Sequence, residues 1–387
     1  MSSPTADPIR HNADWREEFQ PAGLVLASAT LAVAATYAYF LVFAQFGFLK
    51  AVTAAVGEGD GLLRAILAVM GCGGIAGSAL MAWRYQEKQS QPLLMGSLLV
   101  CAAAAGLTLK VRAPAGLFVV ALLTGLGTGG LTVALAATLR RAVGGAWLGT
   151  CLGVGTGLAY AFSNVPAVFE AGPTGQALMA IVAACAGVVA VQGLDLRAPP
   201  QIPAGVDYQP IGVTAWVLIF LVLVGVDSAA FYVIQHTPAL KAEAWSGSGR
   251  LYANALVHLL AGVLAGYALN QRAVGRTVLA ATVMLLTSCL LIDRDYAAFG
   301  KTALLYPAAV SIYSTALVFY PARHGRPALA ALVYSVAGWG GTALGIGLAR
   351  DLNTVPRGFI IAAGLVVAGA LGVRQWARQR AKAALNR

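Results

Sequence analysis

The sequence predicts an all-α membrane protein with twelve transmembrane helices, arranged as two parallel repeats of six, and three observations carry this prediction. First, 59% of the 387 residues are hydrophobic and 11% are charged, whereas soluble domains carry about 25% charged residues. Second, the apolar residues occur in runs of about 20, the length that crosses a bilayer. Third, the second half of the chain repeats short stretches of the first. Because so few charges cannot cover a water-facing surface, a soluble protein is excluded.

The apolar runs are separated by short polar or proline-rich junctions. A clear break at 323–327 (RHGRP) separates the tenth run from the eleventh, and a longer segment from 195 to 211 divides the runs into two sets of six. The expected spans are 23–48, 61–83, 92–109, 115–138, 144–166, 174–194, 213–237, 249–270, 276–292, 301–321, 328–349 and 357–374.

The orientation follows from the distribution of basic residues in the flanks of the spans. Lys and Arg are more frequent on the side that carries both termini, which places both ends in the cytoplasm and suggests a multi-pass protein of the bacterial inner membrane. The N-terminus mixes acids and bases before a long apolar run, so we expect the first helix to be retained rather than cleaved as a signal peptide. The expected regions are a cytoplasmic N-terminal tail (1–22), a first six-helix half (23–194), a central cytoplasmic loop (195–212), a second six-helix half (213–375) and a basic cytoplasmic tail (376–387).

Internal repetition relates the two halves. An even number of spans separates the matching segments, so the two halves are expected to be parallel repeats. The matches are FLVFAQFGFLKA at 40–51 with FYVIQHTPALKA at 231–242, GGIAGSAL at 73–80 with GVLAGYAL at 262–269, and NVP at 164–166 with TVP at 354–356.

Composition and motifs exclude several classes of function. The net charge of +11 would suggest a nucleic-acid partner in a soluble protein, but the basic residues lie in short loops between apolar runs. The five cysteines lie inside apolar runs without CxxC spacing, so no disulfide framework or zinc site is indicated. No P-loop, HExxH or nucleophile elbow is present, which argues against an enzyme and against a cofactor. Glycines at four-residue spacing, Gly145, Gly149, Gly153 and Gly157, predict close contact between helices.

The loop after the second span of each half carries remnants of one motif. In the first half, Gly77 is followed by Met81 four residues later. In the second half, Gly266, Asn270 and Arg272 follow a related pattern with extra residues inserted. Together with the six-plus-six helices, this pattern resembles the major facilitator superfamily, whose loop motif is Gly-x-x-x-Asp-Arg-x-Gly-Arg-Arg. Met81 stands where that motif has its aspartate.

The resemblance covers about residues 20–375. It implies a transporter whose two halves enclose a substrate site at their interface, near the middle of the membrane. The arginine that many proton-driven members carry in the fourth helix is absent from the run at 115–138. The resemblance therefore implies a fold and a general mechanism but no substrate subfamily.

Asp227 is the acidic residue that lies well inside an apolar run; the other Asp and Glu residues fall in termini or loops. A carboxylate at the bilayer centre costs roughly 2.5–3.5 kcal/mol on insertion scales, so such a group usually faces a partner or a water-filled cavity. Its position along the seventh span, about 21 Å from the start of the helix, is near mid-membrane. We expect Asp227 to bind a proton or a cation; the alternative is a carboxyl that bonds a neighbouring helix for packing.

Other polar residues lie near the same depth or just beyond it. His258 lies near the middle of the eighth span, and Asn254 is one helical turn earlier on the same face. A mid-membrane histidine can relay protons or bind a metal, and a satisfied interior histidine is the alternative. Gln235 and His236 follow Asp227 by two turns or more, and for His236 an interfacial position is the alternative.

Aromatic and hydroxyl side chains are expected to shape the pocket, because they populate the helices that line the cavity in the resembled family. The tenth span carries Tyr306, Ser311, Tyr313 and Ser314. Tyrosines at helix ends are commonly interfacial, and Tyr37 and Tyr313 lie deeper. The expected substrate-binding residues are Tyr37, Gln45, Tyr232, Gln235, His236, Asn254 and Tyr313.

These expectations describe a proton-coupled secondary transporter that works by alternating access. Asp227 and His258 are the expected proton-coupling residues, and the expected partners are a small neutral or cationic solute, protons and the lipid bilayer. No Lys or Arg lies in mid-span, which argues against an anionic solute unless that solute travels with protons. Two alternatives remain open: a transition-metal carrier that uses Asp227, His236 and His258, and a non-transporting accessory or assembly subunit of a membrane complex.

Overall fold

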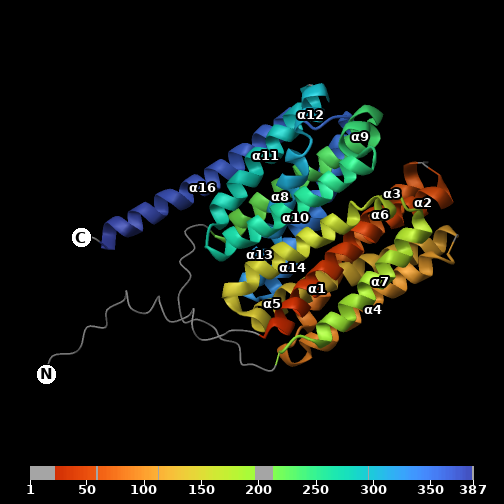
Figure 1. Ribbon diagram of the computed structural model, residues 1–387, viewed down its shortest axis with the longest axis horizontal. Coiled ribbons are helices and arrows are strands. Elements are labelled where there is room, and N and C mark those ends of the chain that lie inside the picture. The colour runs from red at the N-terminus through yellow and green to blue at the C-terminus, as the bar shows by residue number, and fades with distance from the viewer. Residues whose placement is uncertain (1–21, 58–59, 112, 197–211, 295, 386–387) are drawn as a thin grey trace.

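The computed structural model describes residues 22–57, 60–111, 113–196, 212–294 and 296–385, and the regular structure within them is helical. Figure 1 shows long helices that run roughly side by side in one bundle. The predicted all-α class is confirmed for these residues, among which no strand occurs. The predicted N-terminal tail (1–22) and central loop (195–212) lie almost entirely outside them.

The first half of the chain forms the helices that the apolar runs predict, with π-helical turns inserted into the first. The elements are α1 (Gly23–Tyr39), the π-helix η3 (Phe40–Gly47), α2 (Phe48–Val56), α3 (Asp60–Arg84), the 3₁₀-helix η4 (Glu87–Gln89), α4 (Ser90–Thr108), α5 (Pro114–Ser163), α6 (Pro166–Phe169) and α7 (Pro173–Gln192).

The second half of the chain has two short helices, α9 and α12, between its long ones. The elements are α8 (Val213–His236), α9 (Pro238–Trp245), α10 (Ser248–Asn270), α11 (Val274–Arg294), α12 (Tyr296–Thr302), α13 (Leu305–His324), α14 (Pro327–Leu332), the π-helix η5 (Val333–Gly340), α15 (Gly341–Leu352) and α16 (Arg357–Leu385).

Proline and glycine set many of the helix boundaries. Proline occupies the first turn of α5, α6, α7, α9 and α14, where its missing N–H leaves no hydrogen bond unmade. Gly57 and Gly325 follow α2 and α13 with φ values of 76° and 61°, which glycine adopts without a steric penalty. The short connections keep neighbouring helices in contact.

Ten helices among the described residues are long and apolar enough to cross a membrane. One of them, α5, contains 50 residues and is interrupted at Gly144, whose φ of 69° is not helical. The interruption separates residues 114–143 from 145–163, which correspond to the predicted fourth and fifth spans. The 20-residue α13 covers most of the predicted tenth span and is not among the ten. A multi-pass membrane protein is confirmed, while the count of twelve and the cytoplasmic position of both termini stay predictions.

Glycine brings α5 close to two other helices, as the four-residue spacing predicts. A Cβ added to Gly153 would lie 2.7 Å from the Gly266 Cα of α10, and one on Gly125 would lie 2.7 Å from the Gly74 nitrogen of α3. Both distances are too short for a side chain, so only glycine permits this approach. Gly145 is an exception, because a Cβ there would meet open space.

The two sets of helices meet along several elements. The second part of α5 packs on α10 and α13, and α3 packs on α14 and η5. The predicted boundaries of the two halves, 23–194 and 213–375, enclose α1–α7 and most of α8–α16 respectively. α16 continues through most of the predicted basic tail, to Leu385, and Figure 1 shows its C-terminal end projecting beyond the neighbouring helices.

Candidate functional site

Asp227 lies slightly past the midpoint of α8 and bonds two tyrosines of α13. Tyr306 donates a hydrogen bond of 2.6 Å to Oδ1, and Tyr313 donates one of 2.5 Å to Oδ2. The two tyrosines are seven residues apart, which is two helical turns, so both hydroxyls reach from one face of α13. Asp227 is half-buried and the tyrosines are buried. The sequence predicted Asp227 and Tyr313 for the site, and the structure brings them into direct contact.

The electrostatic surroundings of Asp227 are polar but not basic. No Lys, Arg or His forms an ion pair with its carboxyl group among the described residues. An ionised carboxylate is an acceptor with room for about four hydrogen bonds, and two tyrosine hydroxyls supply the donors seen here. The carboxyl group therefore keeps capacity to accept a proton or a positively charged group.

His258 lies at the centre of a second polar contact on the same helix α13. Its Nδ1 is 2.7 Å from the Ser311 hydroxyl. Its ring stacks on the ring of Tyr160 from α5, with centroids 4.7 Å apart and planes 13° apart. The Tyr160 hydroxyl is in turn 3.0 Å from the hydroxyl of Ser314. α13 thus contacts Asp227 of α8 with two tyrosines and the His258–Tyr160 pair with two serines.

Tyr160 is one of the site residues that sequence reasoning missed. It lies in the predicted span 144–166, where the glycine spacing drew attention instead. Thr156 is one turn earlier in α5 and bonds the hydroxyl of Thr315 at 2.9 Å. The polar pair Thr156 and Tyr160, spaced four residues apart, is the signal that would have indicated a polar stripe on this helix.

Two other predicted residues lie in or near the π-helix η3 of the first half. Tyr37 lies in the last turn of α1, and its hydroxyl is 3.4 Å from the hydroxyl of Tyr334 in η5. Gln45 lies within η3 and is half-buried. π-helical turns occur frequently at functional sites. The Tyr37–Tyr334 contact therefore joins α1 of the first half to the π-helix η5 of the second.

The remaining predicted residues lie apart from the Asp227 and His258 contacts. His236 is exposed at the last position of α8, where its Nδ1 is 2.8 Å from the Tyr232 carbonyl and its ring stacks on Tyr232 at 4.0 Å. The Asn254 Nδ2 donates to the Ala244 carbonyl of α9 at 2.9 Å. Gln235 is half-buried and makes no side-chain hydrogen bond within the described part of the chain.

The metal-binding alternative needs Asp227, His236 and His258 to converge. Across the described residues, no group of three or more His, Cys, Asp or Glu side chains is placed to hold a metal ion. His236 also points its Nδ1 to its own helix. The arrangement gives no support to the metal-carrier alternative.

One end of the bundle, where Figure 1 shows α2, α6 and α9, is bridged by aromatic rings. Phe46 of η3 lies against Phe169 of α6 and Phe231 of α8, with centroids 5.8 and 5.5 Å away. Trp245 of α9 contacts Phe169 and Phe231 at 6.1 and 5.4 Å. We call these four residues the aromatic cluster. It joins elements of the first half to elements of the second.

The opposite end of the bundle is bridged by polar contacts. The Asn270 side chain of α10 accepts a bond of 2.7 Å from the Gly149 N–H and donates one of 2.6 Å to the Thr150 hydroxyl, both on α5. The Arg140 guanidinium donates to the Arg323 carbonyl at the end of α13. Contacts between the two halves therefore occur at both ends of the bundle, with the polar site between them.

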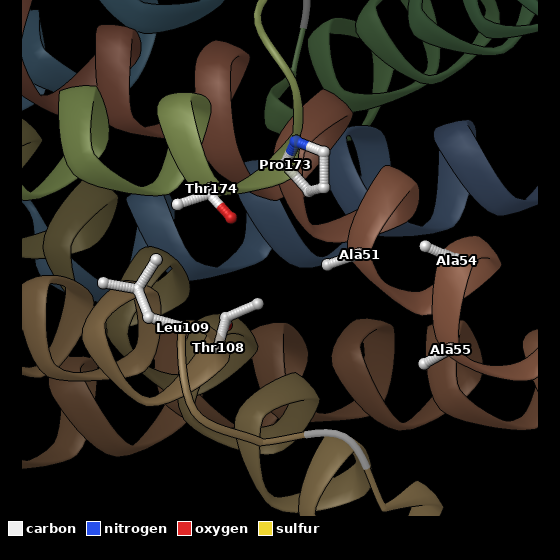
Figure 2. Close-up of a pocket in the computed structure, with 7 residues that line it drawn as sticks. All are labelled: Ala51, Ala54, Ala55, Thr108, Leu109, Pro173 and Thr174. Carbon is white, nitrogen blue, oxygen red and sulfur yellow. The ribbon is translucent and has the colours of Figure 1, made fainter.

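A small pocket lies away from this site, within the first half of the chain. Figure 2 shows it between α2, the end of α4 and the start of α7. Its volume is about 150 Å³. None of the predicted site residues lines it, and its walls are mostly apolar. The lining residues are Ala51, Ala54, Ala55, Thr108, Leu109, Pro173 and Thr174.

Comparison with known proteins identifies the fold. No family model and no curated protein matches the sequence significantly. The structure is similar to that of the human organic anion transporter MFSD10 (TETRAN), with a TM-score of 0.57, 14% identity, and 92% of this chain and 99% of that one covered. It is also similar to the nucleoside transporter NupG, with a TM-score of 0.57, 12% identity, and coverage of 90% and 99%. The predicted resemblance to major facilitator transporters is confirmed at the level of the fold.

Proposed function

We propose that this chain is a proton-coupled secondary transporter of a small neutral or cationic solute. The observation that carries the proposal is the half-buried carboxyl of Asp227, held by Tyr306 and Tyr313 in the interior of a helical membrane bundle. A carboxyl group at this depth is costly, and packing alone would be served by apolar residues. Binding and release of a proton or of a positively charged solute accounts for its presence.

His258 is the second group proposed to titrate during transport. It lies in the interior with Ser311 on one side and Tyr160 on the other. α13 contacts both His258 and Asp227, so a change in one contact can be transmitted along this helix to the other. Tyr37, Gln45, Tyr232, Gln235, His236 and Asn254 remain proposed substrate-binding residues.

Alternating access is proposed as the mechanism, because the two ends of the bundle are bridged by different contacts. Rocking of the two halves about a central site would separate the aromatic cluster at one end while the Asn270 contacts hold the other. The reverse motion would separate Asn270 from Gly149 and Thr150. Each state would then open the site to one side of the membrane.

The charge of the interior supports a neutral or cationic solute. No Lys or Arg is among the buried residues that the structure describes, so no permanently charged cation is present there to balance a negative charge. The organic anion and nucleoside named for the two similar structures are cargoes of those proteins. We propose the bacterial inner membrane as the location, with both termini in the cytoplasm, from the bias of Lys and Arg in the flanks.

A ligand screen followed by uptake tests the proposal. The screen measures Tm, because a ligand that binds the folded protein raises it. Choline and its neutral isostere 3,3-dimethyl-1-butanol are one informative pair, since they differ in charge but not in shape. A solute that raises Tm is then measured for uptake into vesicles containing the purified protein, with and without an imposed pH gradient. Uptake at the same rate with and without the pH gradient would show that transport is not coupled to protons. If no solute that raises Tm is taken up, the protein is not a transporter of these solutes.

The second candidate is an accessory subunit that does not transport. The specific observation in its favour is that both Asp227 oxygens are occupied by hydroxyls of α13, an arrangement that also suits a brace between α8 and α13. Co-purification of a stable membrane partner, together with absence of uptake, would favour this candidate.

A further inference from the structure

Tyr160 is the side chain of the first half that contacts both His258 and α13. Its ring is nearly parallel to the imidazole, 13° apart with a centroid distance of 4.7 Å. Its hydroxyl is 3.0 Å from the Ser314 hydroxyl. His258 itself bonds Ser311 of α13 at 2.7 Å. The histidine therefore belongs with α13 in the second half, and Tyr160 covers it from the first.

Tyr160 is the main polar neighbour of His258 on the other side of the interface between the two halves. Asp227 of α8 lies close enough to act electrostatically on Tyr160 and on Tyr313 of α13, and Cys289 of α11 lies near Asp227. No charged side chain of α5, α6, α9, α11 or α13 pairs with the imidazole within the described residues. The tyrosine ring thus covers one face of the imidazole from the first half.

We propose that Tyr160 is a positioning residue that links the separation of the two halves to proton exchange at His258. This inference rests on the proposed function. While α5 lies against α10 and α13, the Tyr160 ring covers the imidazole and its hydroxyl holds Ser314. When the halves separate, the stack and the Tyr160–Ser314 bond are both lost, and His258 keeps Ser311.

The chemical consequence follows from the state of the imidazole. A neutral histidine carries one N–H and one acceptor nitrogen, and both nitrogens are donors once it is protonated. The imidazole takes up its added proton from water that reaches the uncovered ring. The proton returns to water when the ring is next exposed. Covering by Tyr160 therefore prevents exchange in the closed arrangement, and this keeps protons from leaking through without movement of the halves.

The chain provides a matched control one helical turn away. Thr156 of α5 bonds Thr315 of α13 at 2.9 Å, so it crosses the same interface without stacking on His258. Thr156→Val removes a cross-interface hydrogen bond and leaves the stack in place. Any general loosening of the interface should appear in this variant as well.

The test measures access to His258 directly. Diethyl pyrocarbonate modifies an accessible, unprotonated imidazole, and mass spectrometry gives the rate at each histidine of the full-length protein in nanodiscs over a range of pH. The exposed His236 serves as an internal reference. Tyr160→Leu removes the ring and the hydroxyl, Tyr160→Phe keeps the ring, and Tyr160→Met is a second variant without a ring, whose flexible side chain fills the space.

We expect the rate of modification at His258 to rise roughly threefold to tenfold in Tyr160→Leu and Tyr160→Met. Loss of one aromatic stack shifts the equilibrium between the covered and the uncovered imidazole by about this factor. The rate should also gain the pH dependence of an ordinary histidine. Tyr160→Phe and Thr156→Val should stay close to the wild-type rate and profile.

Equal rates in all variants would overturn the inference, and so would a rise in Thr156→Val as large as that in Tyr160→Leu. Because labelling needs no transported solute, its result is separate from the fate of the proposed function. If Tyr160→Leu exposes His258 while uptake ignores the pH gradient, the covering role stands and proton coupling fails.

Discussion

Phe46 and Phe231 pack edge to face, with ring centroids 5.5 Å apart and planes inclined by 68°. They come from the two segments that align as a sequence repeat, 40–51 and 231–242. The repeated segments therefore meet in space at one end of the bundle. In one copy the helix continues through η3 into α2, and in the other α8 ends at His236 before Pro238 begins α9.

The aromatic cluster is expected to hold this end closed. Phe46→Ala removes ring contacts to Phe169 and Phe231, and hydrogen–deuterium exchange should increase locally in α6 and α9. Phe48→Ala is the control, because Phe48 is fully buried beside Phe43 in the first half. It should lower overall stability by about 3–5 kcal/mol without selective exchange in α9. Selective exchange in α9 in both variants would contradict the closing role.

Asp227→Asn is expected to abolish the dependence of uptake on a pH gradient. The amide cannot gain or lose a proton in the accessible pH range, but its oxygen still accepts a bond from Tyr306 or Tyr313. The free energy of unfolding should therefore change by about 1 kcal/mol or less, which is the contribution of one neutral hydrogen bond. Uptake by the variant that still follows the gradient would show that Asp227 does not couple protons.

Gly153→Ala should destabilise the contact between α5 and α10. The new methyl group would lie 2.7 Å from the Gly266 Cα, and overpacking of this kind typically costs about 1–3 kcal/mol. Gly145→Ala is the matched control on the same helix, since nothing lies within 4 Å of its added Cβ. There the better helix propensity of alanine should leave Tm equal or raised. Equal Tm losses for the two variants would argue against close packing at Gly153.

Asn270→Ala should weaken the polar bridge at the other end of the bundle. It removes the bonds to the Gly149 N–H and the Thr150 hydroxyl, and each neutral bond contributes about 0.5–1.5 kcal/mol. Thr150→Ala removes only the bond to the Thr150 hydroxyl and should lower the free energy of unfolding by roughly half as much as Asn270→Ala. If Thr150→Ala proves as costly as Asn270→Ala, the bond to Gly149 contributes nothing.

Tyr85 provides a test of pH dependence outside the membrane spans. Burial raises the pKa of Tyr85 above its ordinary value of 10.0, while its hydroxyl lies 3.1 Å from that of Thr138. Because the folded pKa is the higher one, the stabilisation is present below pH 10 and is lost as pH rises through the folded value. Tyr85→Phe should remove this component, so the difference in stability between wild type and variant should shrink above pH 10. A difference independent of pH would contradict the raised pKa.

Much of the fold was predictable because the bilayer imposes a simple rule on the sequence. Apolar runs of sufficient length become helices, and glycine spacing at Gly149, Gly153 and Gly157 indicates where helices approach. The break at Gly144 also falls where the sequence separates two spans. These features depend on local composition, which a single sequence records.

The contacts within the site were less predictable. Asp227 and His258 were recognisable because ionisable residues are rare at mid-membrane depth. Which side chains face them depends on the rotation and crossing of whole helices, which local patterns do not record. Tyr160 was missed for that reason, and Asn254 shares a helical face with His258 but bonds α9.

α16 has 29 residues, which is about 44 Å of continuous helix, against a hydrocarbon layer of about 30 Å. A rigid helical fusion partner grafted onto its C-terminal turns would therefore stand clear of the micelle or nanodisc. For electron cryomicroscopy of so small a particle, such a graft offers an asymmetric landmark for image alignment.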